Sequence, residues 1–218
     1  TPTTWARMGA CPHGSEKVVI NFDRDASGKK TTAGDSVSSQ WADYGVEFSG
    51  RRKSHDGKRW VNGNSLRLFD SSNPTGGDDD LGSPNKKCHS CKHPSKCPGV
   101  GSAGKPSNCA DQNKILILDT GSDQPNVSEF GGEITIKFTE TPTKILGFGV
   151  MDVEGSDSKY KIFANGKLKK TGAIDPVGDN GFDIQHFDSH QPNGINKIRF
   201  DIRESMALTH FQFCMKSH

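Results

Sequence analysis

Apolar and polar residues alternate with a period of two along most of this chain. Such alternation, bounded by Gly, Pro, Asn and Asp, is typical of β-strands with one buried face. Two further runs, 114–118 and 144–152, are more continuously apolar, which predicts strands buried on both faces. The alternating runs predict strands over residues 17–22, 45–49, 65–69, 133–138, 160–163, 182–185, 197–202 and 210–214.

About ten short strands without a convincing amphipathic helix predict an all-β fold, an antiparallel two-sheet sandwich of the jelly-roll kind. Asn165-Gly166 lies between two of the chain's polar-rich segments and predicts a hairpin with a type I′ turn. We expect one β-sandwich domain over residues 1–218. Residues 83–113 are rich in Lys, Gly, Pro and Ser, so we expect them to form a cysteine-rich loop insertion within that domain.

Composition and net charge limit the kinds of partner that the sequence predicts. Only 31% of the residues are hydrophobic and 25 are glycines, which predicts many turns and long loops. The net charge of +2 does not favour nucleic acid. No apolar run is long enough to predict insertion into a membrane. The sequence does not predict an oligomeric state.

Six cysteines suggest a disulfide framework. Cys11 and Cys214 lie near opposite ends of the chain, and we pair them because the first and last strands of such sandwiches are often neighbours. The other four, within the insertion, are expected to pair among themselves: Cys88, Cys91, Cys97 and Cys109. The alternative is a zinc site built from Cys88 and Cys91 with Cys97, Cys109, His89 or His93, although the spacing between Cys97 and Cys109 is poor for zinc.

Disulfides indicate an oxidising compartment, so we expect a secreted, extracellular protein. The opening Thr-Pro-Thr-Thr fits a processed secreted chain, and Asn126-Val-Ser128 is a potential N-glycosylation acceptor.

The segment from Leu68 to Gly82 carries the strongest chemical signal. It holds Asp70, followed by three consecutive aspartates, Asp78, Asp79 and Asp80, among Pro and Gly residues after a predicted strand. Adjacent carboxylates repel one another unless a cation lies among them, and oxygen ligands on a flexible loop suit Ca²⁺. A solvated acidic turn is the alternative.

A second acidic site follows the apolar run that ends near residue 152. Asp152 and Glu154 are two residues apart at a strand end, so their side chains point to the same face. We expect them to complete the Ca²⁺ site, with Asp23 and Thr209 as further candidates. A polar strand edge turning into solvent is the alternative.

Two patterns invite enzymatic interpretations. Asp119-Thr-Gly-Ser122 matches the aspartic-protease pattern, but the chain has no second copy of it, so we interpret it as a chance match at a turn. A jelly-roll glycoside hydrolase could use two carboxylates among Asp152, Glu154 and Asp157. No nucleophile, base and orienting group form a recognisable set, so we assign no catalytic residue and do not expect an enzyme.

Aromatic and basic residues suggest an extracellular glycan or matrix component as partner. Trp41 and Trp60 lie in polar, loop-like surroundings, where they could offer a stacking platform. A basic stretch precedes Trp60 and could contact charged groups through Arg51, Arg52, Lys58 and Arg59. The alternatives are tryptophans buried under loops and a solvated basic hairpin. A structural matrix protein stiffened by calcium, without a specific glycan site, is the alternative function.

Several blocks, in order along most of the chain, resemble a secreted Ca²⁺-binding β-sandwich domain found in bacterial extracellular proteins with PEP-CTERM sorting tails and in marine eukaryotes. The most specific is Asn73-Pro-Thr-Gly-Gly-Asp-Asp-Asp-Leu81. The others are residues 19–23, 39–48, 64–72, 114–118, 131–138 and 147–154.

The resemblance implies a calcium-binding jelly roll of the carbohydrate-binding kind. Its implied ligands are Asp23, Asp78, Asp80, Asp152 and Glu154. The chain departs from the family in the insertion at 83–113, and in the last strand, where Leu208-Thr-His210 replaces an Ile-Asp-Asn-like step and puts one ligand in doubt.

Overall fold

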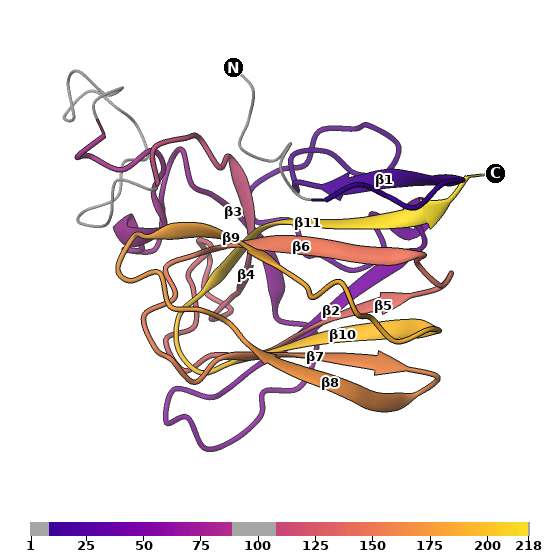
Figure 1. The fold of residues 1–218 in the computed structure, drawn as a ribbon. Helices are drawn as coiled ribbons and strands as arrows, with labels where there is room; N and C mark the ends of the chain where they lie inside the picture. The colour runs from indigo at the N-terminus through magenta and orange to yellow at the C-terminus, as the bar shows by residue number, and fades with distance from the viewer. Residues whose placement is uncertain (1–8, 89–107, 218) are drawn as a thin grey trace.

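The fold is a sandwich of two antiparallel sheets, seen edge-on as two layers in Figure 1. The computed structural model describes residues 9–88 and 108–217. The first sheet has the order β3 (Leu66–Asp70), β4 (Lys114–Leu118), β11 (Ala207–Lys216), β6 (Lys144–Met151) and β9 (Phe182–His186), and β1 (Ser15–Ile20) also pairs with β11. The second sheet has the order β2 (Val46–Arg52), β5 (Gly132–Phe138), β10 (Ile195–Ile202), β7 (Lys159–Ala164) and β8 (Lys167–Ala173).

From β4 onward the chain passes repeatedly from one sheet to the other, with only the β7–β8 hairpin staying within a layer. The predicted all-β, two-sheet class is therefore confirmed. In the described ranges the helical elements are two 3-10 turns, η2 (Ala42–Tyr44) and η3 (Asp79–Leu81).

The main core lies between the inner faces of the two sheets. Phe148 of β6 packs edge-on against Phe200 of β10, with ring centroids 4.9 Å apart, and so joins the two layers. Phe148 and Phe200 are fully buried, as is Phe211 of β11. Burial of each such ring stabilises the fold by about 1.5–3 kcal/mol.

One strand was not predicted. β8 pairs with β7 from Lys159↔Ala173 to Ala164↔Lys167, with a register shift between Ile162 and Phe163, but it is lysine-rich and mostly exposed. The predicted turn between them is present, because Asn165 and Gly166 have φ angles of 51° and 74°. An edge strand that buries little has no alternating pattern to reveal it, and only its turn was visible in the sequence.

A second, smaller apolar cluster lies on the outer face of the first sheet. Ile115 and Ile117 of β4 pack there with Met151 at the end of β6, and Leu81 of η3 covers them. Leu81 is fully buried, so the acidic loop is fixed against the sheet at this point. This cluster places η3 beside the residues that follow β6.

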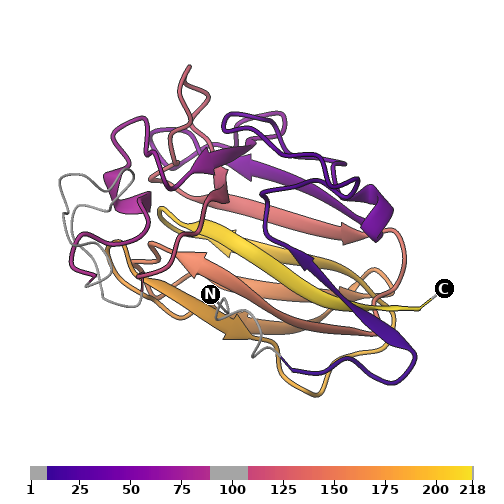
Figure 2. The same cartoon turned by 90° about the horizontal axis from the view of Figure 1, so that it is seen from above.

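Covalent links hold both ends of the described chain. Cys11 is bonded to Cys214 of β11, which confirms that pair, and β1 lies alongside the C-terminal half of β11, from Ser15↔Lys216 to Ile20↔Phe211 (Figure 2). Cys88 is bonded to Cys109, so neither is available as a zinc-binding thiolate. Cys91 and Cys97 lie outside the described residues.

Candidate metal centre

Three aspartates from three separate segments meet at one end of the first sheet. Asp80 lies in η3, Asp152 directly follows β6, and Asp179 lies in the loop before β9. Each offers a carboxylate oxygen, and these oxygens lie within 4.8 Å of one another. We call this group the Asp80–Asp152–Asp179 cluster.

Asp152 is fixed in a constrained position. Its side chain is only 1% exposed, and its φ of 61° lies in the left-handed region, which is uncommon for a residue with a side chain. The backbone N–H of Asn180 donates to its Oδ1 (2.9 Å), and the Ser205 hydroxyl donates to its Oδ2 (2.6 Å). Both oxygens are therefore oriented by neutral donors rather than by a cation.

Asn180 joins the cluster to the ends of the cysteine-rich insertion. Its side-chain amide donates to the carbonyl oxygens of Asp80 and of Gly82, the latter at 2.8 Å. The amide of Asn108 donates to the Asn180 carbonyl oxygen (3.1 Å), and that of Asn85 donates to Asn180 Oδ1. These buried hydrogen bonds hold Asp80 and Asp152 in position, next to the Cys88–Cys109 bond.

The cluster lacks positive charge. Among residues 9–88 and 108–217, no Lys, Arg or His forms an ion pair with Asp80, Asp152 or Asp179. Oδ1 of Asp80 is buried and has no hydrogen-bond partner among these residues. A buried carboxylate oxygen without a partner is costly, and a bound cation would remove that cost.

The pKa values of Asp152 and Asp80 are both raised. Burial raises the pKa of Asp152 to about 7, and the negative charges of Asp80 and Glu154 act in the same direction. Burial also raises the pKa of Asp80, with a further contribution from Asp179. Such shifts arise where like charges share a site with low solvent access.

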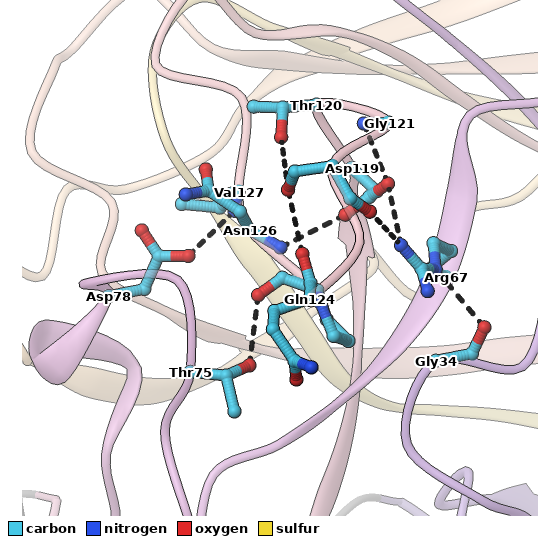
Figure 3. A network of polar contacts seen from close by, with 12 residues as sticks. Gly34, Arg67, Thr75, Asp78, Asp119, Thr120, Gly121, Gln124, Asn126 and Val127 are labelled. Atoms are coloured by element: carbon cyan, nitrogen blue, oxygen red, sulfur yellow. Dashed lines mark hydrogen bonds and ion pairs between the residues drawn. The ribbon is translucent and has the colours of Figure 1, made fainter.

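The other predicted ligands are not members of the Asp80–Asp152–Asp179 cluster. Asp78 accepts a hydrogen bond from the backbone N–H of Val127 (2.8 Å, Figure 3), and burial raises its pKa to about 6. Asp79 and Glu154 are exposed. Asp23 accepts a hydrogen bond from the backbone N–H of Lys114 (3.1 Å), at the opposite end of β4 from Asp119.

Thr209 is also outside the cluster. It is fully buried in β11, and its hydroxyl lies 3.0 Å from Nδ1 of His210. The structure thus brings together Asp80 and Asp152 of the predicted set and adds Asp179, which was not predicted. Gly178-Asp-Asn-Gly181 is a short acidic turn before a strand, and this was the signal that could have indicated it.

Asp119 lies in a different kind of network, shown in Figure 3. It is 3% exposed, and its Oδ2 accepts hydrogen bonds from Gly121 N–H (2.8 Å) and Arg67 Nη1 (3.3 Å). Its Oδ1 accepts a hydrogen bond from Asn126 N–H (2.9 Å). These contacts close the turn after β4 and connect it to Arg67 of β3. Each of these hydrogen bonds to the Asp119 carboxylate therefore has a structural role.

The two candidate platform residues have opposite surroundings. Trp41 is fully buried, its indole N–H donates to the Arg24 carbonyl (3.0 Å), and its ring packs edge-on against Phe22 and Phe48. A ring inside the core cannot stack on a ligand, so Trp41 is removed from the predicted platform. Trp60 is 41% exposed and remains available.

The predicted basic residues lie around Trp60. Arg51 has its guanidinium carbon 4.8 Å from the Trp60 ring centre and also pairs with Glu133 (2.8 Å). Lys58 and Arg59 are exposed on the hairpin, and Arg52 is half-buried. Asn126, the potential glycosylation acceptor, is half-buried and donates its side-chain amide to the Gly76 carbonyl (2.8 Å).

Within the described residues, no helix has the length and apolar character needed to cross a bilayer. No protein-family model, no curated protein and no solved structure matches this chain.

Proposed function

We propose that this protein is a secreted, calcium-binding β-sandwich module that serves extracellular glycan binding or adhesion, and that Asp80, Asp152 and Asp179 hold the ion. The observation that carries the proposal is the convergence of three carboxylates without a neighbouring cation, one of them with a buried, unpartnered oxygen.

The donor set favours Ca²⁺ over other metals. The cluster contains only carboxylates, whereas zinc sites use His and Cys as well. Ca²⁺ takes about six to eight oxygen ligands in irregular geometry, so three carboxylates and several waters form a suitable shell. Mg²⁺ requires stricter octahedral geometry, which loops from three separate segments do not favour.

The two disulfides support the extracellular part of the proposal, because such bonds persist in oxidising compartments. Free Ca²⁺ is abundant outside cells, so a site of modest affinity is sufficient there. Extracellular modules bind Ca²⁺ with dissociation constants of about 10⁻⁴–10⁻³ M.

The test is calcium binding by calorimetry and by thermal unfolding of the chelator-treated protein. About 10 mM Ca²⁺ should stabilise the fold by about 1.4–2.7 kcal/mol through mass action, and equal Mg²⁺ should do less. Asp152→Asn should abolish the response. Asp79→Asn is the matched control, because it makes the same change in charge at an exposed position next to Asp80.

Two results would overturn the proposal. One is a wild-type protein that gives no calcium heat and no thermal shift. The other is an equal calcium response in the wild type and in Asp152→Asn.

A further inference from the structure

A groove crosses one end of the outer face of the second sheet. It has a volume of about 570 Å³, and its floor is formed by side chains of β5, β10 and β7. Glu133, Asp201 and Lys159 form one row across these strands, because they are paired in register. The hairpin that follows β2 forms one wall with Lys53 and Trp60, and Phe130 lies beside it.

The groove carries an excess of positive charge. It is lined by five basic residues, Lys53, Lys159, Lys161, Arg199 and Arg203, and by three acidic ones, Glu133, Asp157 and Asp201. Asp201 pairs with Lys161 (2.6 Å) and Arg199 (2.7 Å), and Arg199 also approaches Glu133 (3.7 Å). Within the described ranges, Lys53, Lys159 and Arg203 form no ion pair with a carboxylate. A chain with a net charge of only +2 thus concentrates available cations in one groove.

Two exposed aromatic rings adjoin these cations. Trp60 is 41% exposed and Phe130 is 38% exposed, and both are among the few large apolar side chains that the described surface leaves in water. Lys53 Nζ lies 3.8 Å from the Trp60 ring centre. The Arg51 guanidinium also lies over this ring, so two cations cover part of it and its exposed remainder is what a ligand can contact.

The groove continues into a second hollow of about 530 Å³, which shares Lys53 and Phe130 with it. Arg52 and His55 line the second hollow. Two adjoining hollows with a basic residue and an aromatic ring at their junction fit an extended polymer better than a single small molecule.

We propose that this groove binds an anionic polysaccharide, whose sulfate or carboxylate groups contact Lys53, Lys159 and Arg203 while a sugar ring packs against Trp60. The inference rests on the proposed extracellular role for the choice of a glycan rather than a nucleic acid. It does not use the Asp80–Asp152–Asp179 cluster, so the two proposals fail separately.

The chemistry explains why both kinds of group are needed. Sugar rings present apolar C–H faces that pack on aromatic rings, and an aromatic contact of this size contributes about a tenfold change in affinity. Each exposed cation contributes less, about two- to fivefold, and salt screens its effect. A neutral polysaccharide would gain nothing from the unpaired cations.

The experiment measures binding of the full chain to dextran sulfate, polygalacturonate and neutral dextran. The first two separate sulfate from carboxylate recognition, and the third tests the need for charge. We expect the wild type to bind at least one anionic polymer and not dextran. Trp60→Ala should weaken binding about tenfold, and Lys159→Ala about two- to fivefold, with the effect of Lys159→Ala lost at about 0.5 M NaCl.

Matched controls come from β8. Lys167→Ala removes an exposed cation at the opposite end of the β7–β8 pair from Lys159, and Leu168→Ala removes an exposed apolar side chain. Both should bind as the wild type does. Asp152→Asn should also retain binding, which separates this inference from the calcium proposal.

The inference is overturned if the wild type binds neither anionic polymer, or if Trp60→Ala and Lys159→Ala bind no more weakly than the two controls while thermal unfolding shows all variants folded. It is also overturned if double-stranded DNA binds as tightly as the better polysaccharide, since the groove would then be a general polyanion surface.

Discussion

Asp119 and Asp152 both directly follow a buried strand of the first sheet, yet their carboxylates have opposite surroundings. Asp119 follows β4 and accepts hydrogen bonds from two backbone N–H groups and from Arg67. Asp152 follows β6 and faces two further carboxylates, with neutral donors on its own oxygens. The protein thus supplies compensating donors and a cation to Asp119 and no cation to Asp152, so only the surroundings of Asp152 make a candidate metal site.

The largest loss of stability is expected from removing the Asp119 carboxylate. Asp119→Ala leaves the Arg67 guanidinium without its carboxylate and two backbone N–H groups without their acceptor, so we expect a loss of about 3 kcal/mol in unfolding free energy. Urea unfolding measures it. The calcium response should persist. A loss no larger than that of Asp123→Ala, an exposed neighbour, would mean that the network contributes nothing.

Asp152→Asn tests the surroundings of Asp152 through the pH dependence of the unfolding free energy. The pKa of Asp152 in the fold is about 7, raised from 3.8, so its charge destabilises the calcium-free protein above about pH 7 and this cost fades as pH falls toward 4. Calcium-free Asp152→Asn should therefore be more stable than the wild type by roughly 2 kcal/mol at about pH 7.5 and by less at pH 5.

Calcium at about 10 mM should largely offset that difference at pH 7.5, because the wild type gains about 1.4–2.7 kcal/mol from the bound ion and the variant gains nothing. Measuring the difference between two variants at each pH cancels other titrations, including that of buried His210, whose pKa is lowered to about 3. A pH-independent difference, unchanged by calcium, would contradict the assigned surroundings of Asp152.

The smallest effect is expected from Arg67→Lys. Arg67 also donates from Nε to the Gly34 carbonyl (3.1 Å) and from Nη1 to the Ser122 carbonyl (2.8 Å), a fork that a lysine ammonium cannot reproduce. We expect a loss of about 1 kcal/mol, since the charge beside Asp119 is retained. A loss of stability as large as that of Asp119→Ala would show that the Asp119 carboxylate depends on the forked geometry of the arginine rather than on its positive charge.

The strands were predictable wherever one face is buried, because burial imposes a period of two on the sequence. β10 illustrates this, because its buried residues Ile198, Phe200 and Ile202 alternate along the predicted run 197–202. β11 is buried at every position from 207 to 215, and the alternating run 210–214 indicated only part of it. β8 shows the limit, since a strand held by pairing with β7 alone leaves no apolar pattern.

The candidate metal centre was predictable only in part. The sequence indicated Asp80 and Asp152, because they lie in acidic segments next to strands. It could not tell which of three consecutive aspartates faces the cluster, since that depends on how Leu81 anchors the turn. Asp179 was missed because its turn carries only one carboxylate, a weaker signal than the three consecutive aspartates at 78–80.

Trp41 was misjudged for a related reason. Polar neighbours in the sequence predicted exposure, but η2 turns its indole into the core against Phe22 and Phe48. Local polarity describes the residues beside a side chain along the chain, and burial depends on residues that are distant in sequence.

The Cys88–Cys109 bond has a consequence for how this sandwich tolerates change. The Cα atoms of the two residues are only 5.4 Å apart, so the two described ranges end and begin again at nearly the same point. The entropy of closing a flexible loop grows only slowly with its length, so we expect added residues between two such closely spaced anchors to cost little stability. Residues 88 and 109 thus define a permissive position for grafting a foreign peptide, provided that Asn85 and Asn108 are left to bind Asn180.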